Sequence, residues 1–281
     1  MNTNLLNGKE NVQIRFKSSP MGRRSHGQDP HNTFTLNAYG SALLVNNVYR
    51  DLWGSPFQTG WVWSSRSQNA VLVNGFGQEP RSAGPEGRIL KTEFLEGLDY
   101  AAGEAAAAYK GRMKRARRHV IFVKPDIVMI ADELEAVEPS TYQWMLHGWE
   151  EFELDETRQR IILDRGKVGV VVDYVSPEPL RLRQWTGYEP EPDAAYLQSV
   201  GRKPFPSQWH VEAASSNPRD SLFAVTVMRV FQDGRTPQTP VRSVRSEGSL
   251  AIETGPLQAN FGPRKVQIRL ADRTWQIGYS E

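Results

Sequence analysis

The fold is decided by the stretch RRHVIFVKPDIVMIADELEAVEPSTYQWMLHG, residues 117–148. It contains three short apolar runs, which are His119–Val123, Ile127–Ala131 and Thr141–Leu146. β-Branched and aromatic residues are frequent in these runs, and proline and acidic residues separate them. Each run is too short for a helix, which usually needs about ten or more residues to bury an apolar stripe. The stretch therefore predicts β-strands joined by turns.

Segments of the same kind recur along the whole chain, separated by Gly, Pro, Asn or Asp. They are Val12–Lys17, Thr33–Tyr39, Ala42–Asn46, Ala70–Asn74, Arg160–Leu163, Val168–Tyr174, Trp209–Ala213, Leu222–Val230, Lys265–Leu270 and Thr274–Tyr279. The helix-friendly stretch Tyr100–Tyr109 predicts either a short helix or an alanine-rich strand packed close to a neighbour. Because no long helical periodicity is found, the sequence predicts an all-β fold, a large antiparallel β-sandwich with few or no helices.

Composition limits the possible functions. The 281 residues are 39% hydrophobic and 10% aromatic and include 23 Gly and 18 Pro, which is typical of a turn-rich globular chain. The net charge of +2 excludes the basic field of a dedicated nucleic-acid-binding protein, so we expect no nucleic-acid partner. Arginine supplies 25 of the 34 basic residues, and arginine binds carboxylates and sulfates with paired hydrogen bonds. This bias fits an acidic ligand, although codon composition explains it as well.

Several common signals do not occur in the sequence. The chain contains no cysteine, so it has no disulfide and no cysteine-based zinc site. Met1–Val12 lacks the basic region and apolar stretch of a signal peptide, and no apolar run of about 18 residues predicts a membrane span. The five histidines show no HxH or HExxH spacing, and no glycine-rich nucleotide motif is found. We therefore expect no membrane span and no cofactor, and the chain itself leaves the compartment open.

The densest polar cluster is SSPMGRRSHGQDPHN, Ser18–Asn32. Glycines and prolines make it a turn-rich segment directly before the expected strand Thr33–Tyr39. At the mouth of a sheet, such a segment can present His26 as a proton acceptor and Arg23 or Arg24 as anion clamps. The alternative is an ordinary solvated loop.

Two long irregular loops carry aromatic residues. Asp51–Ser67 contains Trp53, Trp61 and Trp63, and the proline-rich loop Pro177–Ser207 contains further aromatic side chains. Long loops inside a compact domain are often functional, and aromatic rings on them commonly stack on the apolar faces of sugars. The alternative is that these rings cap the ends of the sandwich.

A basic run, KGRMKRARR, occupies Lys110–Arg118. Such a run can bind a polyanion, but next to a strand it is more often a solvated sheet edge that discourages edge pairing. We therefore expect an exposed edge here.

The segment Ser18–Gln78 resembles the opening of the C-terminal β-sandwich of heparinase II/III-type polysaccharide lyases. Its residues SSPMGRRSHGQDPHNTFTLNAYGSALLVNN and SQNAVLVNGFGQ are similar to the family patterns SSPxGxxSHGHADQNSFxLxAxGxxLLxDxG and xNTxLVxGxGQ. Arg117–Gly148 is similar to the family stretch RHVLFVKPDYxVIxDxLEA…FQWLLH. The resemblance implies a sandwich over residues 1–235, with residues 236–281 as its continuation or as a small second sheet.

The resemblance also assigns residues to a site. His26 matches the histidine that the sandwich contributes to the active-site cleft, and Asn32 matches the Asn of HADQN. The positions of the family's structural metal site hold Gln28, Asn46 and Gln68 in place of His, Asp and, often, His. Neutral amides are poor zinc ligands, so we expect no bound metal and an amide hydrogen-bond network instead.

Lyases of this family cleave uronate polysaccharides by β-elimination. The resemblance implies that His26 acts as base or electrostatic partner, while Arg23 or Arg24 neutralises the uronate carboxylate. We expect the amides of Gln28 and Asn32 to assist, and the rings of the loop tryptophans to contact substrate. These rings are Trp53 and Trp61.

The catalytic Tyr and another His of these lyases come from an N-terminal (α/α)-toroid, which these 281 residues do not contain. We therefore expect a C-terminal piece whose partners are an acidic polysaccharide and a toroid domain or subunit, and which lacks lyase activity alone. A periplasmic or secreted location is implied by the family. The alternatives are a non-catalytic acidic-carbohydrate-binding module and an assembly module.

Overall fold

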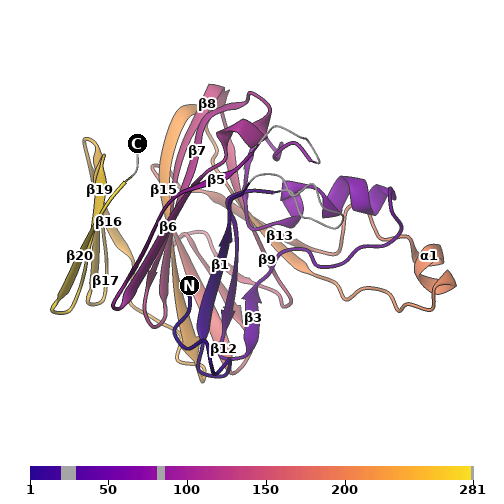
Figure 1. The fold of residues 1–281 in the computed structure, drawn as a ribbon, viewed down its shortest axis with the longest axis horizontal. Helices are drawn as coiled ribbons and strands as arrows, with labels where there is room; N and C mark the ends of the chain where they lie inside the picture. Colours follow the sequence, from indigo (N-terminus) through magenta and orange to yellow (C-terminus); the bar gives the residue numbers. More distant parts are fainter. Residues whose placement is uncertain (20–29, 81–85, 280–281) are drawn as a thin grey trace.

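A computed structural model describes residues 1–19, 30–80 and 86–279 and shows three stacked β layers (Figure 1). The central layer is an eight-stranded antiparallel sheet in the order β10-β11-β12-β15-β8-β7-β6-β5. Its strands are β5 (Arg88–Leu95), β6 (Leu98–Glu104), β7 (Met113–Val123), β8 (Ile127–Ser140), β10 (Glu153–Asp155), β11 (Arg160–Asp164), β12 (Val168–Val175) and β15 (Arg219–Gln232). The all-β prediction is confirmed.

Smaller sheets cover both faces of the central sheet. On one face lie the three-stranded sheet β1-β2-β3 and the four-stranded sheet β13-β14-β9-β4. Their strands are β1 (Val12–Lys17), β2 (Thr33–Ala38), β3 (Ser41–Leu44), β4 (Val71–Val73), β9 (Tyr142–Gly148), β13 (Arg181–Thr186) and β14 (Trp209–Ala214). On the other face lies a five-stranded sheet of β16 (Arg242–Ser246), β17 (Ser249–Thr254), β18 (Leu257–Phe261), β19 (Lys265–Leu270) and β20 (Arg273–Gly278).

The central sheet is apolar on both faces, which explains the continuous apolar runs of the sequence. Successive strand residues point to opposite faces. Val120 and Phe122 pack in the core shared with β1–β4 and β9, whereas Ile121 and Val123 pack in the core shared with the five-stranded sheet. Both sets are fully buried.

Helical structure is short and lies mainly in the loops. Within residues 1–19, 30–80 and 86–279 it consists of a π-helix (Gln58–Val62), two 3-10 helices (Ser65–Ser67 and Ala106–Tyr109) and α1 (Ala194–Ser199). The stretch Tyr100–Tyr109 combines both predicted forms, because it finishes β6 and then turns into a 3-10 helix. The loop Pro177–Ser207 is less irregular than expected, since it contains β13 and α1. None of the helices within the described residues has the length and apolarity to cross a bilayer.

The prediction that the basic run Lys110–Arg118 forms an exposed sheet edge is wrong. Its strand, β7, lies inside the eight-stranded sheet between β6 and β8, so it is no edge. Its charges face acidic residues of β8, which the sequence alone does not pair with them. These pairs are Lys114–Glu135, Arg115–Glu133 and Arg118–Asp132.

The Arg118–Asp132 pair is buried and joins the layers. Arg118 donates to Asp132 from Nε at 2.7 Å and from Nη2 at 3.0 Å, and the side chains are 3% and 2% exposed. Trp144 Nε1 on β9 donates to Asp132 Oδ2 at 2.8 Å. Arg118 Nη1 donates to the carbonyls of Asn32, at 2.8 Å, and Asn69, at 3.1 Å. One ion pair therefore holds the central sheet to the segments that lead into β2 and β4.

We expect Arg118→Met to lower the free energy of unfolding by about 3–5 kcal/mol, because it leaves the Asp132 carboxylate buried without its cation. Urea unfolding followed by circular dichroism measures this loss. The matched control is Arg183→Met, whose exposed side chain pairs with Glu212 at 2.8 Å. That substitution should cost less than about 1 kcal/mol. Equal losses in the two variants would contradict the structural role of the buried pair.

Candidate functional site

A hollow of about 450 Å³, lined by both polar and apolar side chains, lies over the outer face of β1–β3. In β1, Val12 and Ile14 are buried in the core, so the alternation of the strand turns Arg15 and Lys17 outward. Lys17 and Arg15 pair in register with Thr33 and Thr35 of β2, and all four residues line the hollow. Among the described residues that line it, Arg15 and Lys17 are the charged ones. The hollow is therefore cationic.

Amides, one indole ring and smaller apolar groups also line this hollow. The side chains of Asn37, Asn46 and Gln68 contribute amides, and Trp149 contributes an aromatic ring. Amide groups both donate and accept hydrogen bonds, and an indole ring offers an apolar face. Together with the cations, these groups suit a ligand that is anionic, hydroxyl-rich and partly apolar.

Residues 20–29 adjoin this hollow in the chain. Lys17 and Pro30 both line it, and Lys17 Nζ donates to the Pro30 carbonyl at 3.1 Å. Four predicted site residues, Arg23, Arg24, His26 and Gln28, lie outside the described residues, and their roles stay predictions. Lys17 and Pro30, which precede and follow these residues in the sequence, lie at the cationic hollow.

Side-chain hydrogen bonds hold His31 and Asn32, the two residues that precede β2. The Gln78 amide accepts from the His31 backbone N–H at 2.6 Å and donates to the His31 carbonyl at 2.8 Å. Asn32 is buried with a left-handed φ of 53°, and its Nδ2 donates to the carbonyls of Gly103 and Ala116. Its Oδ1 has no hydrogen-bond partner among the described residues. Asn32 thus holds the end of the segment, and a substrate contact for it stays a prediction.

Two of the three degenerate metal positions, Asn46 and Gln68, form hydrogen bonds, and the third, Gln28, lies outside the described residues. Asn46 Oδ1 accepts from the Asn69 backbone N–H at 2.8 Å, and Gln68 Nε2 donates to Ser67 Oγ at 3.1 Å. Asn69 extends this amide network to the Phe34 carbonyl, at 2.8 Å. The donor set does not fit zinc, which prefers imidazole, thiolate or carboxylate ligands. Within residues 1–19, 30–80 and 86–279, no three His, Cys, Asp or Glu side chains gather as metal ligands.

The loop tryptophans differ in exposure. Trp53 is 56% exposed and meets Trp63 edge to face, with 5.3 Å between ring centroids. Trp61 is fully buried, 4.8 Å from the His210 ring and 6.0 Å from the Tyr188 ring. Its ring cannot stack on a sugar while this packing lasts. The substrate contact of Trp61 stays a prediction that this burial argues against, and Trp53 is the accessible ring of the two.

Two buried histidines support this loop cluster from β9 and β14. His147 Nδ1 lies 2.7 Å from His210 Nδ1, and His210 Nε2 lies 2.6 Å from the Gly187 carbonyl. Since a carbonyl only accepts, His210 carries its proton on Nε2, and His147 donates from Nδ1. Burial lowers the pKa of His210 to about 4, and burial together with His210 lowers the pKa of His147. Both rings are therefore neutral at neutral pH.

Sequence reasoning missed Arg15, Lys17, Gln78 and Trp149 as site residues. For the two cations a signal existed, because the strand Val12–Lys17 alternates apolar and polar residues. Gln78 ends the stretch that is similar to the family pattern xNTxLVxGxGQ, but its role was not predicted. Trp149 carries no local signal, since its position depends on contacts across the fold.

Acidification should destabilise the protein through His210. Its pKa is about 4 in the folded chain and about 6.5 unfolded, so the unfolded state binds more protons between these values. Stability should therefore fall as the pH falls from 7 to 5, by about 2 kcal/mol for this group alone. Urea unfolding at pH 7, 6 and 5 measures the slope. His210→Gln keeps a donor and an acceptor, and it should flatten the slope by that amount. An unchanged slope would contradict the assignment.

Comparisons with known proteins agree with this architecture. A heparinase III structure with methylated lysines aligns with 100% of this chain and 42% of its own, at 15% identity and a TM-score of 0.71. The heparan sulfate lyase HepC from Pedobacter heparinus aligns with 100% and 42%, at 14% identity and a TM-score of 0.69. These likenesses show a shared fold. The chain thus spans less than half the length of those proteins.

The family comparison covers nearly all of the sequence. A search of curated proteins gave no match. Residues 4–272 match the family described as Heparinase II/III-like, C-terminal. That range includes the cationic hollow and all sheets of the structure up to the last hairpin. The chain belongs to the heparinase II/III-like C-terminal family.

Proposed function

We propose that this chain is the β-sandwich part of a polysaccharide lyase that cleaves uronate-containing acidic polysaccharide by β-elimination. The observation that carries the proposal is the hollow over β1–β3, whose charged described residues are Arg15 and Lys17. The lyase names of the similar structures support the same class of substrate. On this proposal, the chain alone binds the polysaccharide without cleaving it.

The chemistry explains why cations are needed at the site. In β-elimination a base removes the proton at C5, the bond between C4 and the glycosidic oxygen breaks, a C4=C5 double bond forms, and the leaving oxygen receives a proton. The C5 proton becomes acidic only when the adjacent carboxylate is neutralised, since its removal adds negative charge there. Arg15 and Lys17 supply cations at the hollow, and Arg23 or Arg24 would add a clamp from the adjoining segment.

His26 is the proposed base or electrostatic partner, with the amides of Gln28 and Asn32 assisting the neutralisation. Catalysis also needs a group that protonates the leaving oxygen. The resemblance places the family's catalytic tyrosine and a second histidine on a toroid domain, which lies outside these 281 residues. A toroid domain or subunit is therefore the proposed partner, and a periplasmic or secreted location is proposed from the same family. Trp53 is the proposed aromatic contact.

A non-catalytic acidic-carbohydrate-binding or assembly module is the second candidate. The same cationic hollow favours it, because binding a uronate requires cations but no base. An in-frame toroid-coding sequence directly upstream in the genome would distinguish the lyase part from such a module.

Acidic-glycan binding should depend on Arg15 and Lys17. We expect affinity electrophoresis to show retardation in gels containing heparan sulfate or alginate and none in dextran gels. Arg15→Ala/Lys17→Ala should weaken retention at least about tenfold, because charged hydrogen bonds contribute about 1.5–3 kcal/mol each. The control Arg158→Ala/Lys167→Ala removes the same charge from exposed positions outside the hollow. If both double variants lost retention equally, the loss would follow from net charge alone, and this result would contradict a binding site in the hollow.

The isolated chain should release no 4,5-unsaturated product from heparan sulfate or alginate. Ultraviolet absorbance of the new double bond measures this. Product formation by the purified 281-residue chain would overturn the proposal that the sandwich alone only binds.

A further inference from the structure

A second hollow, of about 480 Å³, lies where the central sheet meets the five-stranded C-terminal sheet. Figure 1 shows this sheet on the side of the central sheet opposite to β1–β3. The hollow is lined from β7, β8 and β15 on one side and from the β16–β17 hairpin and the end of β18 on the other. Its volume lies in the range of about 300–1,000 Å³ typical of small-molecule sites, and such sites often form between packed units. It is separate from the proposed substrate hollow.

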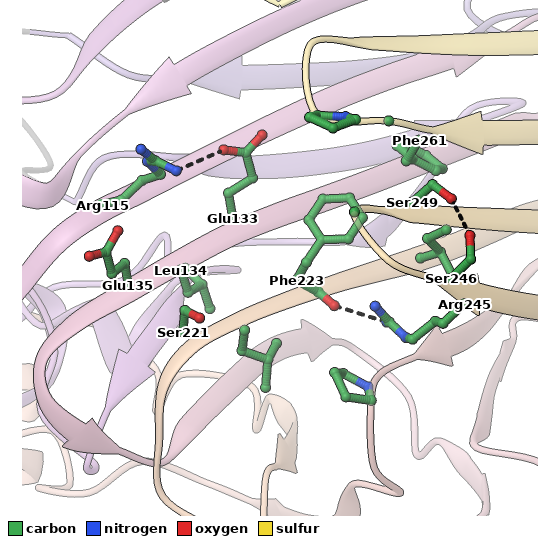
Figure 2. Close-up of a pocket in the computed structure, with 16 residues that line it drawn as sticks. Arg115, Glu133, Leu134, Glu135, Ser221, Phe223, Arg245, Ser246, Ser249 and Phe261 are labelled. Atoms are coloured by element: carbon green, nitrogen blue, oxygen red, sulfur yellow. Dashed lines mark hydrogen bonds and ion pairs between the residues drawn. The ribbon is translucent and has the colours of Figure 1, made fainter.

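An aromatic ring forms the middle of this hollow. Figure 2 shows Phe223 between a group of Arg115, Glu133 and Glu135 and a group on the β16–β17 hairpin. Phe223 is half-buried, and the buried Phe261 backs it at 5.8 Å between ring centroids with the planes tilted by 60°. The hollow therefore offers an apolar face flanked by polar groups on two sides.

The acidic group of the first side is held in place from behind. Glu133 Oε1 accepts from His119 Nε2 at 3.0 Å, and His119 Nδ1 lies within hydrogen-bond distance of the Tyr100 hydroxyl, at 2.8 Å. Burial alone raises the pKa of Glu133, but the His119 hydrogen bond and nearby arginines lower it overall. Arg115 Nη1 lies 3.8 Å from Glu133 Oε2, which is a loose ion pair. This side thus presents a fixed carboxylate beside a half-exposed guanidinium.

The second side carries Arg245 and two serines. Arg245 Nη2 donates to the Phe223 carbonyl at 2.9 Å, which fixes the guanidinium beside the aromatic ring (Figure 2). The Ser246 and Ser249 hydroxyls lie 2.6 Å apart. Hydroxyls both donate and accept, whereas a guanidinium only donates. The two sides together offer donors and acceptors around one apolar face.

The charges of this hollow cancel, unlike those of the hollow over β1–β3. Its charged lining residues, counted over the part of the chain that the structure describes, are Arg115, Arg245, Glu133 and Glu135. A uronate carboxylate here would meet two carboxylates as well as two guanidinium groups, so it gains no net attraction, while the hydroxyls of an uncharged sugar can hydrogen-bond to both kinds of group. The apolar C–H face of a sugar ring suits the Phe223 ring.

We propose that this hollow is a second, non-catalytic saccharide site, which binds an uncharged sugar unit against Phe223. For the class of ligand, a polysaccharide, this inference rests on the proposed function. A polysaccharide with both acidic and uncharged units could reach both hollows at once. It would then bind more tightly than a ligand of either hollow alone, because binding at one hollow raises its effective concentration at the other.

Neutral trisaccharides test the site directly. Saturation-transfer difference NMR titrations with chitotriose, cellotriose and trigalacturonate give occupancy and affinity for the 281-residue chain. We expect at least one neutral trisaccharide to bind, and more tightly than trigalacturonate. Ser221→Trp fills the hollow from an exposed position and should weaken neutral binding at least tenfold, as should Phe223→Ala.

The controls separate this site from the first one. Ser243→Trp places the same ring at another exposed strand position outside the hollow and should leave affinity within twofold. Arg15→Ala/Lys17→Ala should also leave the affinity for neutral trisaccharides unchanged. A failure of the proposed function would therefore appear only in the retention of acidic glycans. The inference is overturned if no neutral trisaccharide binds, or if Ser221→Trp and Ser243→Trp bind equally well.

Discussion

The buried ion pair between Arg118 and Asp132 is the contact on which the layered arrangement depends. Two desolvated charges are costly unless their remaining hydrogen-bonding capacity is used, and here it is used across layers. The guanidinium reaches the carbonyls of Asn32 and Asn69, and the carboxylate accepts from Trp144. The central sheet is thereby bonded to the segments that begin β2 and β4, and to β9. Apolar packing alone is not directional and would not fix this register.

The same contact determines where the candidate chemistry is attached. Asn32 ends the segment expected to carry His26, and the Gln78 amide holds the adjacent His31 backbone on both its N–H and carbonyl sides. Asn46 stands where the family resemblance places a metal ligand, and its side-chain amide accepts from the backbone N–H of Asn69, which joins two neighbouring segments. Hydrogen bonds of side-chain amides can hold backbone segments together without a bound cation. The positive charge of the hollow therefore comes from Arg15 and Lys17, on the face of a strand.

Strands buried on both faces were predictable from the sequence, because burial on both sides requires continuous apolar runs. The edge strands β5 and β16 were missed, since β16 is exposed throughout and β5 mostly so. The strands β13, β17 and β18, which alternate buried and more exposed residues, were missed as well. The basic run was misread for a related reason. Its partners lie on β8 in a cross-strand register, and a local pattern of charges cannot show that register. Strand identity is thus a local property, whereas edge or centre is a property of the whole sheet.

The site was predictable only where a single strand carries it. Alternation along β1 is enough to place Arg15 and Lys17 on one face, but nothing local distinguishes Trp53 from Trp61. Their difference arises because Trp61 packs on His210, which lies on β14 far along the chain. Because smaller sheets cover both faces of the central sheet, ligands can bind only on the outer layers and where an outer layer meets the central sheet. The cationic hollow over β1–β3 and the charge-balanced hollow beside β16–β18 meet this constraint on opposite sides, and their different charges make them suited to different parts of one polymer.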